Sequence, residues 1–187
     1  MKATLNEAEK RLCLYIARSR NAASREVAPA DALRVSQDDP ITIDYEGAMG
    51  ELSLSKILNI YPTEIFDPSV KSSSAGSDRG DLTFNGVCID VKTTKYANGR
   101  LICRTKNPAI NLIILMTGRD GNYEMKGGMW SADMYSRERF GVHSVLQNSK
   151  QCYLAEQHEL IKPDDLLAQL SRTSFSKANP ETSKYDW

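Results

Sequence analysis

The sequence has few of the residues that mark a zinc site, an exported chain or a membrane span. It contains only four cysteines and two histidines in 187 residues. The cysteines are far apart and form no CxxC pair, which argues against structural zinc and favours reduced thiols. No apolar run approaches the roughly 18 residues of a membrane span, and charges interrupt the N-terminal stretch where a secretory signal would be apolar. We therefore expect a cytoplasmic protein without a membrane partner.

The chain also lacks a net charge, because 24 lysines and arginines balance 24 aspartates and glutamates. Affinity for nucleic acid would have to come from local clusters of basic residues. Between residues 92 and 106 the chain has basic residues and no acidic one; they are Lys92, Lys95, Arg100, Arg104 and Lys106. We interpret this segment as a candidate phosphate track. The alternative is that Lys95 and Arg100 only solubilise a turn.

The spacing of apolar residues predicts two N-terminal helices. The first covers 5–20, and Thr4 and Glu7 have the spacing of a capping box at its start. Its polar face carries basic residues that we interpret as solvated in preference to contacting DNA; they are Lys10, Arg11, Arg18 and Arg20. The second helix is predicted over 47–59. The glycines of "GAMG" near its start would let another backbone or a ligand come close.

The rest of the chain predicts strands and two short helices. Predicted strands lie around residue 65 and over 100–105, 111–116 and 123–130. The 111–116 segment is apolar throughout, which is typical of a central strand. Ser131 is predicted to cap a short helix that runs to about 140, and Pro163 to begin the last helix after another strand.

The stretch "GDLTFNGVCIDVKTTKY", residues 80 to 96, predicts a β-hairpin. Its Asn-Gly pair suits a type I′ turn, in which both central residues have positive φ. A two-residue loop fixes the register, so one face of the hairpin is apolar and belongs to the core. The other face carries Asp81, Thr83, Cys88, Asp90 and Lys92. In this register Asp81 lies directly opposite Asp90.

Two opposed carboxylates destabilise a sheet unless something neutralises them. Lys92 can neutralise only one charge. A divalent cation between the two aspartates would resolve the conflict, and oxygen ligands favour Mg²⁺ or Mn²⁺ over zinc. The alternative is an exposed hairpin face on which the two side chains point apart into water.

These residues resemble the PD-(D/E)xK, or restriction-endonuclease-like, nuclease superfamily over roughly residues 44–130. Asp81 matches the first acid of its motif, and Asp90-Val91-Lys92 matches the acid-x-lysine triplet of the next strand. Gly80 stands where the motif name has proline. The stretch "GAMGE" places Glu51 where many members have a helical glutamate, with Glu46 a less suitable substitute.

The resemblance implies an α/β fold with an αβββαβ core, a mixed central β-sheet and flanking helices. It also implies a metal-dependent deoxyribonuclease of phage or mobile-element DNA processing. The ligands of Mg²⁺ or Mn²⁺ would be the carboxylates of Glu51, Asp81 and Asp90 with the Val91 carbonyl. Lys92 would orient water or stabilise developing charge. We expect DNA as the partner, and duplex cleavage would favour a homodimer.

Three further expectations concern a loop, the domain division and an alternative function. Lys71, Ser73 and Arg79, in a serine- and glycine-rich loop, could contact the DNA backbone. The chain is divided into an N-terminal segment at 1–40, a nuclease-like domain at 41–171 and a polar tail at 172–187. A module that keeps the nuclease fold, binds nucleic acid and does not cut is the alternative function.

Overall fold

Five strands form the main sheet, in the order β1-β6-β5-β3-β2. The structure is a computed structural model that describes residues 1–27, 39–66, 80–142 and 151–173. The strands are β1 (Lys2–Thr4), β2 (Leu82–Phe84), β3 (Val87–Thr94), β5 (Leu112–Arg119) and β6 (Asn122–Trp130). Because β3 and β5 are parallel and the other neighbours antiparallel, the sheet is mixed. The segment predicted to be central is β5, which lies in the middle of the sheet.

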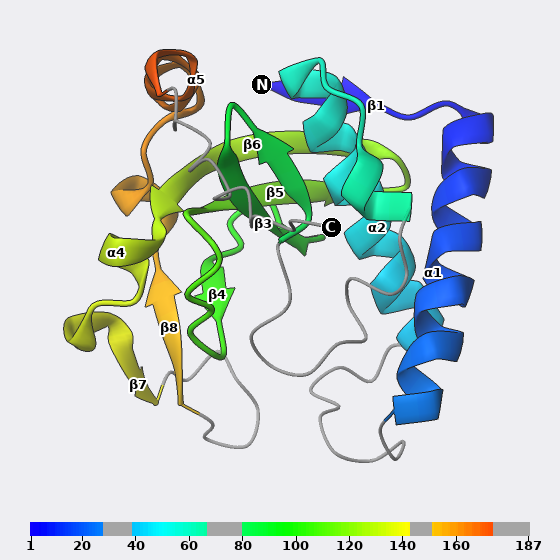
Figure 1. Cartoon of the computed structure of the whole chain (residues 1–187), viewed down its shortest axis with the longest axis horizontal. Helices are drawn as coiled ribbons and strands as arrows, with labels where there is room; N and C mark the ends of the chain where they lie inside the picture. The colour runs from blue at the N-terminus through cyan, green and yellow to red at the C-terminus, as the bar shows by residue number, and fades with distance from the viewer. Residues whose placement is uncertain (28–38, 67–79, 143–150, 174–187) are drawn as a thin grey trace, which may run out of the picture.

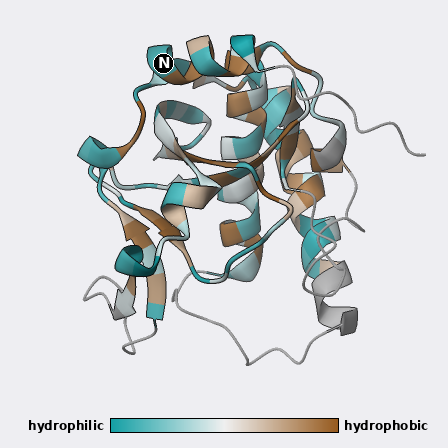
Figure 2. Ribbon diagram, turned by 60° about the vertical axis from the view of Figure 1, so that its left-hand side comes forward, coloured by the Kyte–Doolittle hydropathy of each residue, from teal (hydrophilic) through white to brown (hydrophobic). Residues whose placement is uncertain are grey.

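Three helices contribute to the larger hydrophobic core. They are α1 (Glu7–Val27), α2 (Pro40–Leu58) and α5 (Pro163–Arg172). Their buried residues form one cluster with Ile89, Val91 and Ile114 of the sheet. Figure 1 shows α1 running alongside α2, on the opposite side of the molecule from β4, β7 and β8. The helices carry both teal and brown residues in Figure 2, as expected when one face of a helix contacts a core.

A smaller sheet of three strands lies on the other side of the molecule. Its order is β4 (Leu101–Cys103), β8 (Gln151–Ala155) and β7 (Phe140–Val142). Together with α4 (Ser131–Met134) it buries a second apolar cluster against Ile113 and Leu115 of β5. The fold is therefore mixed α/β with a mixed sheet and flanking helices, as predicted.

The predicted capping box is displaced by two residues. Thr4 belongs to β1, and its hydroxyl contacts the Asn122 side chain at 3.1 Å. The Asn6 side chain instead accepts the Glu9 N–H at 3.0 Å, and the Glu9 carboxylate accepts the Asn6 N–H at 2.7 Å. Pairing of the first residues with β6 thus moves the start of α1 to Glu7. Sequence spacing alone could not show this pairing, because it joins residues far apart in the chain.

Other predicted boundaries also differ from the structure. The segment around 65 is a 3₁₀ turn, η1 (Thr63–Phe66), and not a strand. The second helix begins at Pro40, seven residues before its predicted start, because proline is compatible with the first helical turn. Ser131 is the first residue of α4 and not its cap, and this helix ends at Met134.

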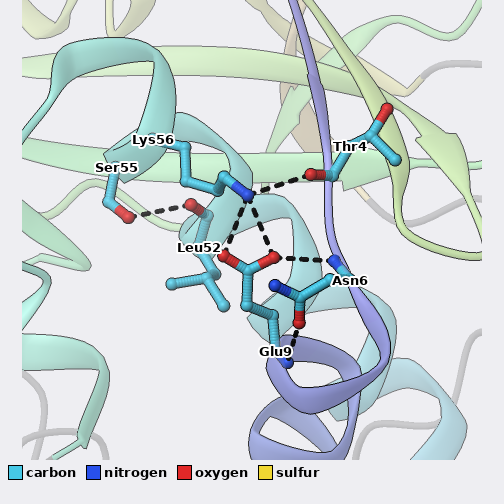
Figure 3. Close-up of polar contacts among 6 residues, drawn as sticks. All are labelled: Thr4, Asn6, Glu9, Leu52, Ser55 and Lys56. Carbon is cyan, nitrogen blue, oxygen red and sulfur yellow. Dashed lines mark hydrogen bonds and ion pairs between the residues drawn. The ribbon is translucent and has the colours of Figure 1, made fainter.

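Lys56 connects the beginning of α1 to α2. Its ammonium donates to the Thr4 carbonyl at 3.0 Å and contacts the two Glu9 carboxylate oxygens at 2.8 and 2.9 Å (Figure 3). These contacts join β1, α1 and α2 at one end of the helix pair. A second ion pair between the same helices lies closer to the hairpin and is described below.

Candidate active site

The hairpin forms as predicted. Asn85 and Gly86 have φ values of 50° and 80°, and Leu82 pairs with Ile89 in the expected register. Along β3, buried and half-buried residues alternate, so that Ile89 and Val91 face the helices. Asp90 and Lys92 pair in register with Ile113 and Leu115 of β5, whose side chains belong to the second apolar cluster. The two polar residues therefore face the side of β4.

Asp81 departs from the predicted opposition to Asp90. The β2–β3 ladder includes no residue before Leu82, and the Asp81 N–H donates to the Ile89 carbonyl at 2.8 Å. The buried carboxylate of Asp81 turns toward β3 and accepts the Val91 N–H at 2.6 Å. A backbone donor thus compensates part of its charge, which the simple register argument did not anticipate.

The position of Asp81 also bears on the Val91 carbonyl. The N–H and C=O of one strand residue point to the same edge of the strand. Since the Val91 N–H points to Asp81, the Val91 carbonyl faces that same edge of β3. The expected ligand pair of Asp81 and the Val91 carbonyl is therefore on one side of the strand.

Asp90 and Lys92 form an ion pair. The Lys92 ammonium contacts the two Asp90 carboxylate oxygens at 2.9 and 2.7 Å. Burial of Lys92 lowers its pKa, but attraction first to Asp90 and then to Asp81 outweighs burial and raises the pKa above its usual value. The ammonium is therefore within electrostatic reach of both aspartates.

Glu51 lies in the interior and is paired with Arg20 of α1. Glu51 is 3% exposed and Arg20 is 6% exposed. The two carboxylate oxygens of Glu51 accept from the two terminal guanidinium nitrogens of Arg20 at 3.0 and 2.6 Å. The interpretation of Arg20 as a solvated residue was therefore wrong. Arg20 continues the buried stripe of Cys13 and Ala17 at helical spacing, a signal that the sequence contained.

The electrostatics of Arg20 connect this ion pair to the hairpin. Burial lowers the pKa of Arg20, but Glu51 first, and then Asp81 and Asp44, outweigh that effect and raise it. Asp81 is thus within electrostatic reach of two cationic side chains, Arg20 and Lys92. The structure brings Asp81, Asp90 and Lys92 together. Glu51 is connected to this group only through Arg20, which binds Glu51 and is attracted by Asp81.

The two glycines of α2, Gly47 and Gly50, differ in how closely other atoms approach them. A Cβ at Gly50 would lie 2.1 Å from the Thr93 hydroxyl oxygen, so Gly50 allows β3 to approach the helix. At Gly47 the nearest atom would be a Glu51 carboxylate oxygen at 4.0 Å. Glu46, the less suitable substitute for Glu51, accepts a hydrogen bond from the Tyr123 hydroxyl of β6.

A groove of about 580 Å³ opens beside Asp90 and Lys92. Its other lining residues include Ile43, Ile102, Cys103, Arg104, Asn107 and Tyr135. A neighbouring hollow of about 590 Å³ shares Lys92, Thr93 and Ile102 with it and extends to Tyr96 and Arg100. We call the two together the Lys92 groove. Tyr96, at its rim, is 61% exposed.

Three members of the basic track line this groove, namely Lys92, Arg100 and Arg104, and the members of the track differ in their environment. Lys95, Arg104 and Lys106 are exposed. Arg100 is half-buried and forms an ion pair with Glu156 at 2.8 Å, which the sequence did not indicate. Lys71, Ser73 and Arg79 lie outside the described residues.

The other nucleophilic and titratable residue types do not suggest an alternative centre. Burial, first of all, raises the pKa of the Cys103 thiol in the groove to about 12, so this thiol is protonated at neutral pH. All four cysteines are free. His158 is exposed in η3 (Gln157–Glu159), and His143 lies outside the described residues.

In the described ranges, no three or more His, Cys, Asp or Glu side chains are grouped as metal ligands. The helices of the same ranges include none that is long and apolar enough to cross a membrane. Comparison with family models, curated proteins and solved structures finds no match to this chain.

Proposed function

We propose that this protein is a divalent-metal-dependent nuclease that hydrolyses phosphodiester bonds of DNA. The observation that carries the proposal is the position of Lys92. Its ammonium is paired with Asp90, is attracted by Asp81 and lines a groove that basic residues border. Metal-dependent phosphodiester hydrolysis combines metal-binding carboxylates with a cation near the scissile phosphate.

The donor chemistry fits Mg²⁺ or Mn²⁺. Asp81, Asp90 and the Val91 carbonyl supply oxygen donors, which both ions prefer. Asp81 and the Val91 carbonyl face one edge of β3, and Asp90 is adjacent in the strand. A bound ion would lower the pKa of a coordinated water and polarise the phosphate. Lys92, released from Asp90 by that ion, would be available to the substrate.

The proposal includes a restriction-endonuclease-like core, and two features of the topology support it. A helix precedes the acid-bearing hairpin, and β3 and β5 form a parallel pair in a mixed sheet. The connection between these parallel strands runs through β4, with no helix in residues 95–111. An αβββαβ core would thus be modified by the smaller sheet that forms one wall of the Lys92 groove.

Cleavage of a panel of DNA substrates tests the proposal. Single-stranded, duplex, flap and four-way-junction DNA would be incubated with Mn²⁺ and, separately, with EDTA. We expect cleavage of at least one substrate with Mn²⁺, none with EDTA, and loss of cleavage in Asp90→Asn. A wild-type protein that binds these substrates and cuts none would favour the alternative, a binding module that retains the fold.

A further inference from the structure

The ion pair between Arg20 and Glu51 changes what Glu51 can do at the proposed metal site. Each Glu51 carboxylate oxygen accepts a hydrogen bond from a different guanidinium nitrogen of Arg20. This bidentate geometry is the strong form of an arginine–carboxylate contact. A cation that used Glu51 as a ligand would have to displace Arg20 from it.

Displacement would be costly because both partners are in the interior. The Arg20 and Glu51 side chains are 7% and 4% exposed. Separating the pair would leave a charge buried without its partner, which is strongly unfavourable. The Ile65 carbonyl also accepts from Arg20, at 3.4 Å. The surrounding structure therefore favours the paired state of Glu51.

Arg20 also influences the other carboxylates of the site. Asp81 and Asp44 both contribute to the electrostatic stabilisation of its guanidinium. The positive charge of Arg20 is therefore felt at Asp81, one of the two aspartates that carry the proposed metal. A fixed positive charge close to a metal site lowers its affinity for a second cation.

From these contacts we infer that Arg20 is a positioning residue, which withholds Glu51 from the metal and limits the site to one divalent cation on Asp81 and Asp90. This inference rests on the proposed metal-dependent function and deepens it. The sequence resemblance implied that Glu51 is itself a ligand. In the inferred arrangement Arg20 takes the place that a second metal ion would otherwise have beside Glu51.

Calorimetric titration with Mn²⁺ tests the inference through two variants. Arg20→Met removes the charge and frees Glu51, so Mn²⁺ should bind on the order of tenfold more tightly, or with a second ion. The double variant Arg20→Met/Glu51→Gln removes both charges together. It should bind one Mn²⁺ with the wild-type affinity, because Glu51 is not a ligand in the inferred arrangement. A merely structural ion pair would change the melting temperature and leave Mn²⁺ binding unaltered.

Lys56→Met is the matched control. It removes a cation from the other ion pair between α1 and α2, whose Glu9 partner lies 11 residues before Arg20, about 16 Å along a helix. This control should leave Mn²⁺ binding unchanged. If Arg20→Met fails to fold because Glu51 is left buried and unpaired, the double variant, which has no unpaired charge, still decides the question.

The outcomes separate this inference from the proposed function. Loss of Mn²⁺ binding in the double variant would show that Glu51 is a ligand and overturn the inference alone. Unchanged binding in a folded Arg20→Met would also overturn it alone. No binding in the wild type, with binding in Arg20→Met, would contradict the proposed function and the inference together, because the wild-type site should hold one Mn²⁺. Absence of binding in both would contradict the proposed function and this inference with it.

Discussion

At the scale of single residues, the candidate site is defined by which charges are compensated by which partners. Asp90 is paired with Lys92, and Glu51 with Arg20. Asp81 accepts a backbone N–H and is within reach of both cations. The acidic residues of the motif therefore have partners inside the protein, and a bound metal ion would redistribute these contacts.

Gly50 is the residue at which the helix that carries Glu51 approaches the sheet. Gly50→Ala should lower the free energy of unfolding by about 1–3 kcal/mol, because its methyl group would overlap Thr93. Gly47→Ala, the matched control, has room for the methyl group and should raise stability by about 0.5–1 kcal/mol. Urea denaturation measures both changes.

A second substitution checks the cause of the effect at Gly50. A methyl group at this position would lie 2.1 Å from the Thr93 hydroxyl oxygen and 2.9 Å from the Thr93 Cγ2. Thr93→Ala removes both atoms and should restore a large part of the stability lost in Gly50→Ala. Equal destabilisation with and without Thr93→Ala would show that the helix and strand do not approach each other in this way.

At the scale of elements, the walls of the Lys92 groove come from two sheets. β3 supplies Asp90 and Lys92, and β4 supplies Ile102 and Cys103. The loop between these strands is attached to η3, because the Gln157 side chain donates to the carbonyls of Ala97 and Gly99 at 2.9 and 2.7 Å. The loop that carries Tyr96 at the rim of the groove is therefore held in place by hydrogen bonds from Gln157.

The two arginines of this wall should differ in their contribution to DNA binding. Arg104→Ala should weaken binding to all sequences alike and reduce the slope of log K against log salt by about 1, as expected for one lost phosphate contact. Arg100→Ala should change the slope less, because Glu156 already compensates the charge of Arg100. Fluorescence anisotropy over a series of salt concentrations measures the slopes.

Arg11→Ala provides a control with the same change in charge. Arg11 is exposed on α1, on the other side of the molecule from β4. Its substitution should leave the slope close to that of the wild type. A slope that falls equally in all three variants would indicate a general charge effect, and an unchanged slope in Arg104→Ala would remove the groove from the DNA interface.

The sequence predicts those elements that form through contacts between residues close together in the chain. The hairpin register follows from a two-residue turn, and the central position of β5 follows from a continuous apolar run. The strand β1 is three residues long and forms by pairing with β6, far away in the chain, so local patterns do not indicate it. The position of the Asp81 side chain could not be predicted from the hairpin register either. Asp81 lies outside the β2–β3 ladder, and its carboxylate accepts the Val91 N–H.

At the scale of the whole molecule, the N-terminal segment contributes directly to the candidate site. Within the predicted N-terminal segment at 1–40, β1 pairs with β6, and Arg20 of α1 contacts Glu51 of α2. The long-range packing of two helices determines that contact. Apolar spacing could place Arg20 on the buried stripe, but it could not identify Glu51 as the partner.

Metal binding should stabilise the whole fold. At a Mn²⁺ concentration 100 times the Kd, binding to the folded state adds about 2.7 kcal/mol. For a chain of this length that corresponds to a rise in Tm of roughly 5–10 °C. In Asp90→Asn most of this rise should be lost. A wild-type Tm that millimolar Mn²⁺ and Mg²⁺ leave unchanged in a thermal denaturation series would argue against a metal site.

The central claim is that Lys92 acts on the substrate beside a metal held by the aspartates. Single-turnover DNA cleavage by the wild type and Lys92→Ala, at Mn²⁺ concentrations shown by calorimetry to saturate both, tests it most directly. The variant should keep or improve Mn²⁺ affinity, since a competing charge beside Asp90 is removed. Its cleavage rate should fall on the order of 10²-fold or more. Cleavage at the wild-type rate would show that Lys92 is only the counter-ion of Asp90 and would contradict the account.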